Sequence, residues 1–196
     1  MQQFRYIATS VGSATQLGYE SVSVFENKNG RRIESRTVAY NCATPEQRLQ
    51  FLVDDDWSPL QVILEVGSDF SFSCIFDDAA CTMCSIIRGD KEQRVVELAR
   101  RTAFVLLNGI FYLPLHLIRR FDFHSSGVQR FSIPPVGVCE IARVHGAPSL
   151  GDNRKMRLEA RFFLCGSEET LDIVADSKLN LLEYTARQAN CRIALE

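Results

Sequence analysis

The 196-residue sequence contains none of the short motifs that identify a common enzymatic reaction. A nucleophile elbow, a glycine-rich phosphate loop, an HExxH zinc motif and a dinucleotide-binding fingerprint are all absent. The sequence therefore gives no support for cofactor-dependent redox chemistry or for phosphoryl transfer. We expect a protein that works without a cofactor and without a bound metal.

Long hydrophobic runs and an excess of positive charge are also missing. No segment approaches the roughly 20 apolar residues of a membrane-spanning helix, and residues 1–20 lack the basic region and apolar run of a signal peptide. Lysine and arginine number 22 against 24 aspartates and glutamates, and they are spread in small groups instead of forming a basic face. We therefore expect a cytoplasmic protein with no membrane span and no nucleic-acid partner.

Cysteine occurs seven times, an odd number, at irregular spacing. Without a signal peptide, reduced and buried thiols are the simplest interpretation, and a secreted protein with three disulfides is the alternative. Cys81 and Cys84 form a CxxC pair, but zinc normally needs four ligands, and residues three apart on a strand point to opposite faces. We interpret these two residues as core cysteines.

What the chain does contain is alternation of polar and apolar residues over most of its length, which is typical of β-strands. Residues 19–25 and 31–40 predict a hairpin around Asn29-Gly30, because a tight turn needs positive φ. On this hairpin we expect an inward face of Val22, Val24, Val38 and Tyr40, and a solvated face of Arg31, Arg32, Glu34 and Arg36.

Two further groups of strands follow the hairpin. Turn residues divide residues 60–98 into a four-strand meander, in which Phe70, Phe72, Cys74 and Phe76 share one face. Further strands are predicted over residues 128–133, 136–144, 155–164, 170–176 and 179–187. About nine or ten strands are too many for one flat sheet. We predict a single domain over residues 1–196, mainly β, built as a strongly curved antiparallel half-barrel or open barrel.

Some segments have an ambiguous pattern. Residues 45–53 begin like a capped helix at Thr44-Pro45, but they also fit a strand. Residues 99–113 fit an amphipathic helix that covers the phenylalanine face. Residues 115–124 alternate like a strand, and the loop over 145–153 is a candidate lid.

The candidate catalytic residues lie on that last predicted strand. His116, Asp122 and His124 would project to one side together with Arg120, and two imidazoles beside a carboxylate suit acid–base chemistry. The alternative is a packed His116 within an ordinary ion-paired strand. A metal site is disfavoured, because the outer members of this group are too far apart along a strand to share one ion.

Aromatic residues form the second candidate site. Small-molecule pockets are mostly apolar with a few polar groups, and a filled core is the alternative use of the same residues. The predicted ligand-binding residues are Trp57, Phe70, Phe72, Phe76, Tyr112 and Arg120, within a wider aromatic set that adds Phe104, Phe111, Phe162 and Phe163.

The order of elements resembles that of the LolA and LppX lipoprotein carriers and of the violacein-pathway enzyme VioE. The stretch LDIVADSKLNLLEY, residues 171–184, looks like the final hairpin of such folds. This resemblance implies a curved antiparallel sheet that cups a small ligand or a lipid. It carries no functional residue over to this sequence.

These observations lead to two functional hypotheses. The first is a cytosolic, cofactor-independent biosynthetic enzyme that binds a small apolar or aromatic molecule and uses His116, His124 and Asp122 for acid–base help. The alternative is a non-catalytic module that binds a lipid, another ligand or a protein. Homodimerisation through an exposed strand edge is a further hypothesis.

Overall fold

The computed structural model of the chain describes residues 1–40, 46–68, 70–77, 80–88, 91–95, 118–122, 124, 127–132, 137–143, 155–164 and 167–196. Fourteen strands in this part of the chain form one antiparallel sheet. The first seven are β1 (Gln2–Ser10), β2 (Gln16–Asn27), β3 (Gly30–Ala39), β4 (Glu46–Val53), β5 (Pro59–Val66), β6 (Phe70–Asp77) and β7 (Ala80–Arg88). The others are β8 (Lys91–Val95), β9 (Gln129–Ser132), β10 (Gly137–Arg143), β11 (Met156–Leu164), β12 (Ser167–Ala175), β13 (Leu181–Ala186) and β14 (Cys191–Leu195).

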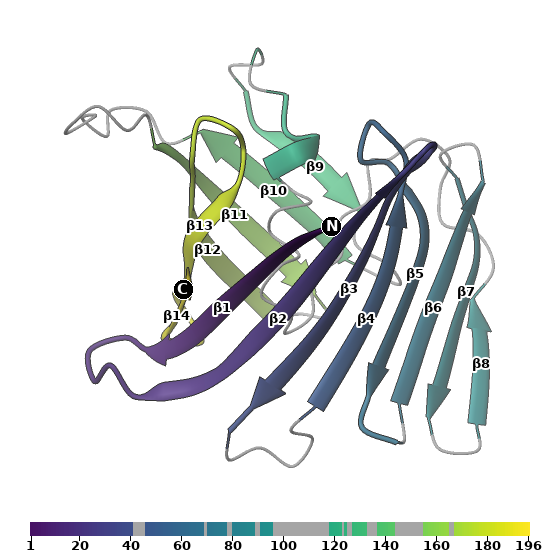
Figure 1. The fold of residues 1–196 in the computed structure, drawn as a ribbon, viewed down its shortest axis with the longest axis horizontal. Helices are drawn as coiled ribbons and strands as arrows, with labels where there is room; N and C mark the ends of the chain where they lie inside the picture. Colours follow the sequence, from purple (N-terminus) through teal and green to yellow (C-terminus); the bar gives the residue numbers. More distant parts are fainter. Residues whose placement is uncertain are drawn as a thin grey trace.

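The first and last strands pair with each other in the middle of the sheet. The strand order is β8-β7-β6-β5-β4-β3-β2-β1-β14-β13-β12-β11-β10-β9, and Tyr6 of β1 lies opposite Leu195 of β14. Two meanders therefore extend from this seam, and the sheet curls so that they form two walls (Figure 1). The predicted β class and open-barrel architecture are confirmed, but the sheet has more strands than the nine or ten expected.

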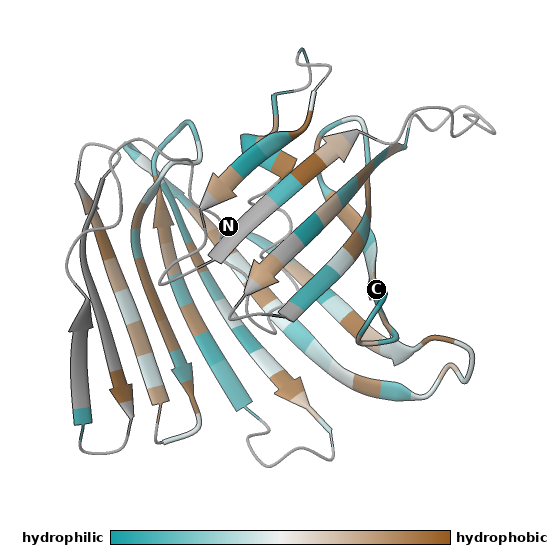
Figure 2. Ribbon diagram, turned by 180° about the vertical axis from the view of Figure 1, so that it is seen from behind, coloured by the Kyte–Doolittle hydropathy of each residue, from teal (hydrophilic) through white to brown (hydrophobic). Residues whose placement is uncertain are grey.

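The core follows from strand periodicity, because alternate side chains lie on the same face of a sheet. Hydrophobic and hydrophilic residues alternate along the strands (Figure 2). One row of directly opposed residues crosses β2 to β6 and is buried throughout: Val24, Ile33, Phe51, Val62 and Cys74. This continuous apolar row holds five consecutive strands together.

A parallel row carries polar side chains into the interior. Glu20, Thr37 and Gln47 are opposed across β2, β3 and β4, and the first two are 0% and 3% exposed. Burial raises the pKa of Tyr184 well above its ordinary value, and the nearby Glu20 carboxylate raises it further. The inner side of the sheet is thus crossed by a polar band instead of being wholly apolar.

The structure decides one alternative that the sequence left open and corrects one predicted face. Residues 46–53 form strand β4 and no helix, with Leu49, Phe51 and Val53 buried by alternation. In β3, Arg31 shares its face with Ile33, and Tyr40, which follows the strand, is 42% exposed. The predicted inward Val38 and Tyr40 therefore belong with Arg32, Glu34 and Arg36 on the outer face, because residues two apart along an extended chain point to the same side.

The phenylalanine face of β6 is confirmed. Phe72, Cys74 and Phe76 are buried, and Phe70 is half-buried against the core. The predicted covering helix over residues 99–113 and the predicted lid over 145–153 lie outside the described residues.

The prediction of reduced cysteines is wrong for Cys74, whose sulfur forms a disulfide. Cys84 of β7 is the residue opposite Cys74 in the β6–β7 register. Cys191 is a free, half-buried cysteine, and the other cysteine side chains, including those of the CxxC pair, lie outside the described ones.

Candidate functional site

The connection between β4 and β5 is a tight turn organised by Asp54. Its carboxylate Oδ1 accepts hydrogen bonds from the backbone N–H groups of Asp56 at 2.9 Å and Ser58 at 2.7 Å. The Asp54 N–H donates to the carbonyl of Ser58, and the Trp57 N–H donates to the carbonyl of Asp54. Trp57 adopts a φ of 61°, which is unusual for a bulky residue and marks a constrained backbone.

The connection between β12 and β13 repeats this turn, with Asp176 in the place of Asp54. Oδ1 of Asp176 accepts from the N–H groups of Lys178 and Asn180, both at 2.8 Å. The two backbone–backbone bonds recur between the equivalent residues, and Leu179, the equivalent of Trp57, has a φ of 64°. Two turns that lie 122 residues apart in the sequence thus share one hydrogen-bond scheme.

A helical turn at residues 118–120 connects these two Asp turns. Arg120 Nη1 donates to Ser58 Oγ at 2.7 Å, and Arg119 Nη2 donates to Asn180 Oδ1 at 3.2 Å. Ile118 and Phe121, at 0% and 4% exposure, anchor this turn in the core. The three segments therefore form one connected unit between the two walls of the sheet.

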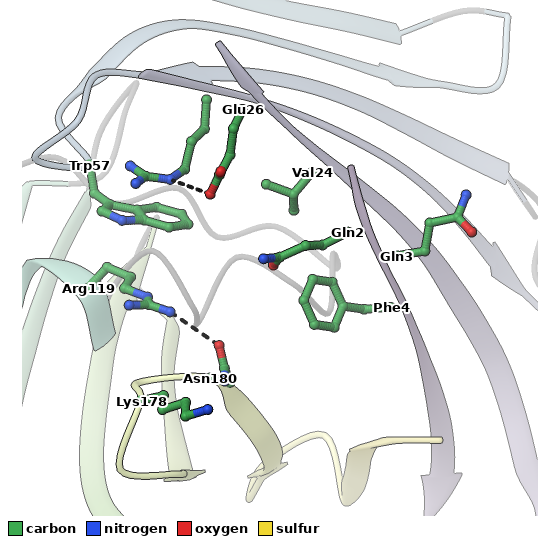
Figure 3. Close-up of a pocket in the computed structure, with 10 residues that line it drawn as sticks. Gln2, Gln3, Phe4, Val24, Glu26, Trp57, Arg119, Lys178 and Asn180 are labelled. Atoms are coloured by element: carbon green, nitrogen blue, oxygen red, sulfur yellow. Dashed lines mark hydrogen bonds and ion pairs between the residues drawn. The ribbon is translucent and has the colours of Figure 1, made fainter. Parts of the chain in front are cut away.

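A cavity of about 650 Å³ adjoins this unit (Figure 3). Its volume lies in the range of small-molecule sites. The cavity combines apolar, amide and charged side chains, namely Phe4, Val24, Trp57, Gln2, Gln3, Asn180, Glu26, Arg31, Arg119 and Lys178. Gln3 points away from the others in the close-up (Figure 3), so the remaining nine form the inner lining.

The cationic side chains of the cavity are organised around Trp57. The guanidinium of Arg31 lies 5.1 Å from the centre of the Trp57 ring, and that of Arg119 lies 5.3 Å from it. Arg31 also donates to the carbonyl of Asp55 at 3.2 Å and lies 3.9 Å from the carboxylate of Glu26. Among the described lining residues, three are cationic and one is anionic, so this part of the lining carries net positive charge.

The Asp176 carboxylate faces its own turn instead of the cavity. Burial by itself raises its pKa, but hydrogen bonds from Asn180 and Lys178, with the positive charge of Arg119, outweigh this effect and lower the pKa. Oδ2 accepts a further bond from Asn180 Nδ2 at 2.9 Å. The ionised form is therefore the one that the turn stabilises.

We expect Asp176→Asn to lower stability more at neutral pH than in acid. A carboxyl group whose pKa is lowered on folding stabilises the protein fully above its ordinary pKa of 3.8, and this contribution is lost as the pH falls through the folded-state value. The loss should not exceed about 1 kcal/mol at pH 7, because solvent screens this partly exposed group. Urea denaturation at pH 7 and pH 3 measures it, with the exposed Asp55→Asn as control. An equal loss at both pH values would contradict this assignment.

The structure brings together only part of the predicted site. Trp57 lines the cavity, and Arg120 holds the first Asp turn. Phe72 and Phe76 are core residues, with Phe70 beside them, and none of the three is among the cavity-lining residues described. Tyr112 and His116 lie outside the described residues, as do Phe104 and Phe111. Phe163 is 42% exposed, and nothing is described of the side chain of Phe162.

The predicted strand over residues 115–124 is wrong at residues 118–120, which are helical. Buried Ile118 and Phe121 are three residues apart, a helical spacing that the local alternation conceals. Asp122 and His124 are exposed, and the Asp122 carboxylate accepts the backbone N–H of His124 at 2.9 Å. These contacts make Asp122 a turn-forming residue, while the acid–base role of the three residues stays a prediction.

Sequence reasoning missed the cationic lining formed by Arg31, Arg119 and Lys178. The aspartate at the first position of each turn, Asp54 and Asp176, is the signal that could have located two of the segments involved. Within the described residues, no group of three or more histidine, cysteine or acidic side chains is placed to hold a metal ion. None of the described helices has the length and apolar character that crossing a membrane requires.

Comparisons with known proteins support the fold. No protein-family model matches the sequence, and a search of curated proteins finds no similar sequence. The chain is similar to the crystal structure of a β-barrel-like protein of the domain of unknown function DUF1849 from Brucella abortus, with a TM-score of 0.61 and 10% identity over 99% of this chain and 94% of that one. It also matches a DUF1089 family protein from Pseudomonas aeruginosa with a TM-score of 0.46 and 12% identity, over 84% and 88% of the two chains. The first of these likenesses bears out the barrel-like fold expected from the sequence, whereas the specific likeness to LolA, LppX and VioE stays a prediction.

Proposed function

We propose that this protein binds a small molecule with an apolar or aromatic part in the cavity beside Trp57. The observation that carries this proposal is the cavity of about 650 Å³, which has Phe4, Val24 and Trp57 among its lining residues. Burying a ring against such side chains supplies about 1.5–3 kcal/mol for each large apolar group. The amide group of Gln2, which also lines the cavity, provides a polar contact of the kind that fixes orientation in small-molecule sites.

Binding without catalysis is better supported than catalysis. The cavity lining includes no histidine among the described residues, and Asn180 and Arg120 are engaged in holding the two turns. The hypothesis of a biosynthetic enzyme rests on His116, His124 and Asp122. Its test is turnover by His116→Ala and His124→Ala variants once a substrate is known.

Trp57 gives a direct test, because it is the one tryptophan of the chain. We expect the neutral dye N-phenyl-1-naphthylamine to quench Trp57 fluorescence on titration. Phe4→Ala should weaken dye binding about tenfold, since it removes an apolar contact from the cavity wall. Phe25→Ala is the matched control, because Phe25 lies under Arg32 and outside the described cavity lining.

Two results would count against the proposal. Native mass spectrometry of freshly purified protein that finds no bound molecule, together with no quenching by the dye, would reject ligand binding. If the Phe4→Ala and Phe25→Ala variants bound the dye with equal affinity, the dye would be bound outside the cavity beside Trp57.

The cellular location and the oligomeric state stay predictions. The disulfide at Cys74 favours an oxidising compartment over the cytoplasm, because disulfides persist mainly in oxidising surroundings. Within the described part of the sheet, β8 and β9 each have one strand neighbour, so these two edges are where a second copy could add to the sheet.

A further inference from the structure

We infer that the ligand of the Trp57 cavity is an anionic amphiphile: a phosphate or carboxylate group joined to an apolar or aromatic body. This inference rests on the proposed function and names the chemical class of ligand. Arg119 and Lys178 are the residues that we assign to the anionic group, and Phe4 and Val24 to the apolar body.

The first argument is the arrangement of charge around the cavity. Arg31, Arg119 and Lys178 converge on it from three separate segments, whereas Glu26 is the one acidic residue among the described lining side chains. Asp176 is close in space, but its oxygens accept hydrogen bonds from Lys178 and Asn180 within the turn. The positive charge facing the cavity is thus only partly compensated by the protein itself.

The second argument is that Arg119 is held in place before any ligand arrives. Its guanidinium lies over the Trp57 ring and donates to Asn180 Oδ1, which restricts the side chain from two directions. A guanidinium that is already ordered loses little entropy on binding, and its fork of N–H groups suits phosphate and carboxylate oxygens. Charge-assisted hydrogen bonds of this kind are about twice as strong as neutral ones.

The third argument is the separation of the two kinds of lining. In the close-up, Arg119, Lys178 and Asn180 lie on one side of the cavity, and Phe4 and Gln2 of β1 lie on another. Val24 of β2 lies beside Glu26, which forms an ion pair with Arg31 (Figure 3). A molecule with one charged end and one apolar end matches this polarity. The volume of about 650 Å³ suits a small molecule or one lipid headgroup with part of its chain.

The test compares two dyes that share one ring skeleton and differ in a sulfonate group. The neutral dye is N-phenyl-1-naphthylamine, and the anionic dye is 8-anilino-1-naphthalenesulfonate. We expect the anionic dye to bind at least about tenfold more tightly at low salt, and this advantage to shrink as the salt concentration rises.

The variants identify the residues responsible. Arg119→Gln should weaken the anionic dye about tenfold or more, and Lys178→Gln about threefold to tenfold, while both leave the neutral dye unchanged. Arg157→Gln and Lys155→Gln are matched controls, because these exposed residues of and beside β11 are outside the described cavity lining and lower the net charge equally. Lys178 is exposed, so its variant still gives an answer if Arg119→Gln fails to fold.

Competition then separates two sources of the anionic group. Displacement of the anionic dye by dodecyl phosphate but not by 1-naphthyl phosphate indicates a lipid-like ligand, and the reverse indicates a soluble aromatic ester. Either result supports the inference.

Equal affinity for the two dyes, with no effect of Arg119→Gln or Lys178→Gln, would overturn the anionic assignment while the proposed cavity stands. Failure of both dyes to quench Trp57 would instead reject the proposed function itself.

Discussion

Replacing Phe51 with alanine is expected to destabilise the folded protein by about 3–5 kcal/mol, the usual loss for removing a buried phenylalanine. Phe51 is 1% exposed and lies between Ile33 and Val62 in the apolar row that crosses β2 to β6. Truncation removes its own buried surface and leaves a void between two rigid neighbours. Because protein cores are close-packed, the neighbouring strands can fill only part of that void.

The neighbouring residue provides the control. Gln50 is exposed on the opposite face of β4, and Gln50→Ala should change stability by no more than about 0.5 kcal/mol. The free energy of unfolding from urea titrations measures both effects. Similar losses for the two variants would mean that the face assignment of β4 is wrong.

Replacing Gly30 with alanine should cost about 2–5 kcal/mol for a different reason. Gly30 has a φ of 135°, and a β-carbon at this position would lie 2.1 Å from the carbonyl oxygen of Val53 and 2.8 Å from Cα of Asp54. An unfavourable backbone conformation costs about 1–2 kcal/mol and overpacking about 1–3 kcal/mol. Both contacts are with backbone, so no side-chain rotation relieves them.

Two other glycines separate these two contributions. Gly12 has a φ of 92° with open space around it, so Gly12→Ala should show the conformational cost alone. A β-carbon on Gly18 would lie 2.3 Å from the carbonyl oxygen of Val38, so Gly18→Ala should show the steric cost alone. The urea midpoint of Gly30→Ala should be the lowest of the three. A Gly30 variant as stable as the Gly12 variant would contradict the close approach of β3 to the first Asp turn.

Most strands of the sheet could be predicted because they have a recognisable local sequence pattern. Alternation and turn residues located β2, β3, β5 to β8 and most strands of the second meander, within a few residues. The assignment of inner and outer faces was less accurate where both faces of a strand are partly apolar. An example is the end of β3, where Val38 and the following Tyr40 are outer residues. Neither β1 nor β14 was predicted. In β1, the contrast between the apolar residues Phe4, Tyr6 and Ala8 and their neighbours is too weak to indicate a strand.

The position and most of the lining of the cavity could not be predicted, because its residues meet only through tertiary contacts. Trp57 is predicted as a ligand-binding residue from its aromatic character, but Arg119 and Lys178 look like ordinary solvated charges in the sequence. Their convergence depends on two turns 122 residues apart and on the helical turn between them. A hydrogen bond such as that from Arg119 to Asn180 leaves no periodic pattern for local reasoning to detect.

The pairing of the first strand with the last also sets the order of folding events. Tyr6 and Leu195 are opposed at the seam, so this contact closes almost the whole length of the chain. Hairpins within each meander can form early because their partners are close in sequence, whereas closing such a long loop is slow. During synthesis, β1 cannot pair with β14 until residues 191–195 have been made. Until then an unpaired strand edge is available to other chains, so this late step is the point at which misassembly competes with folding.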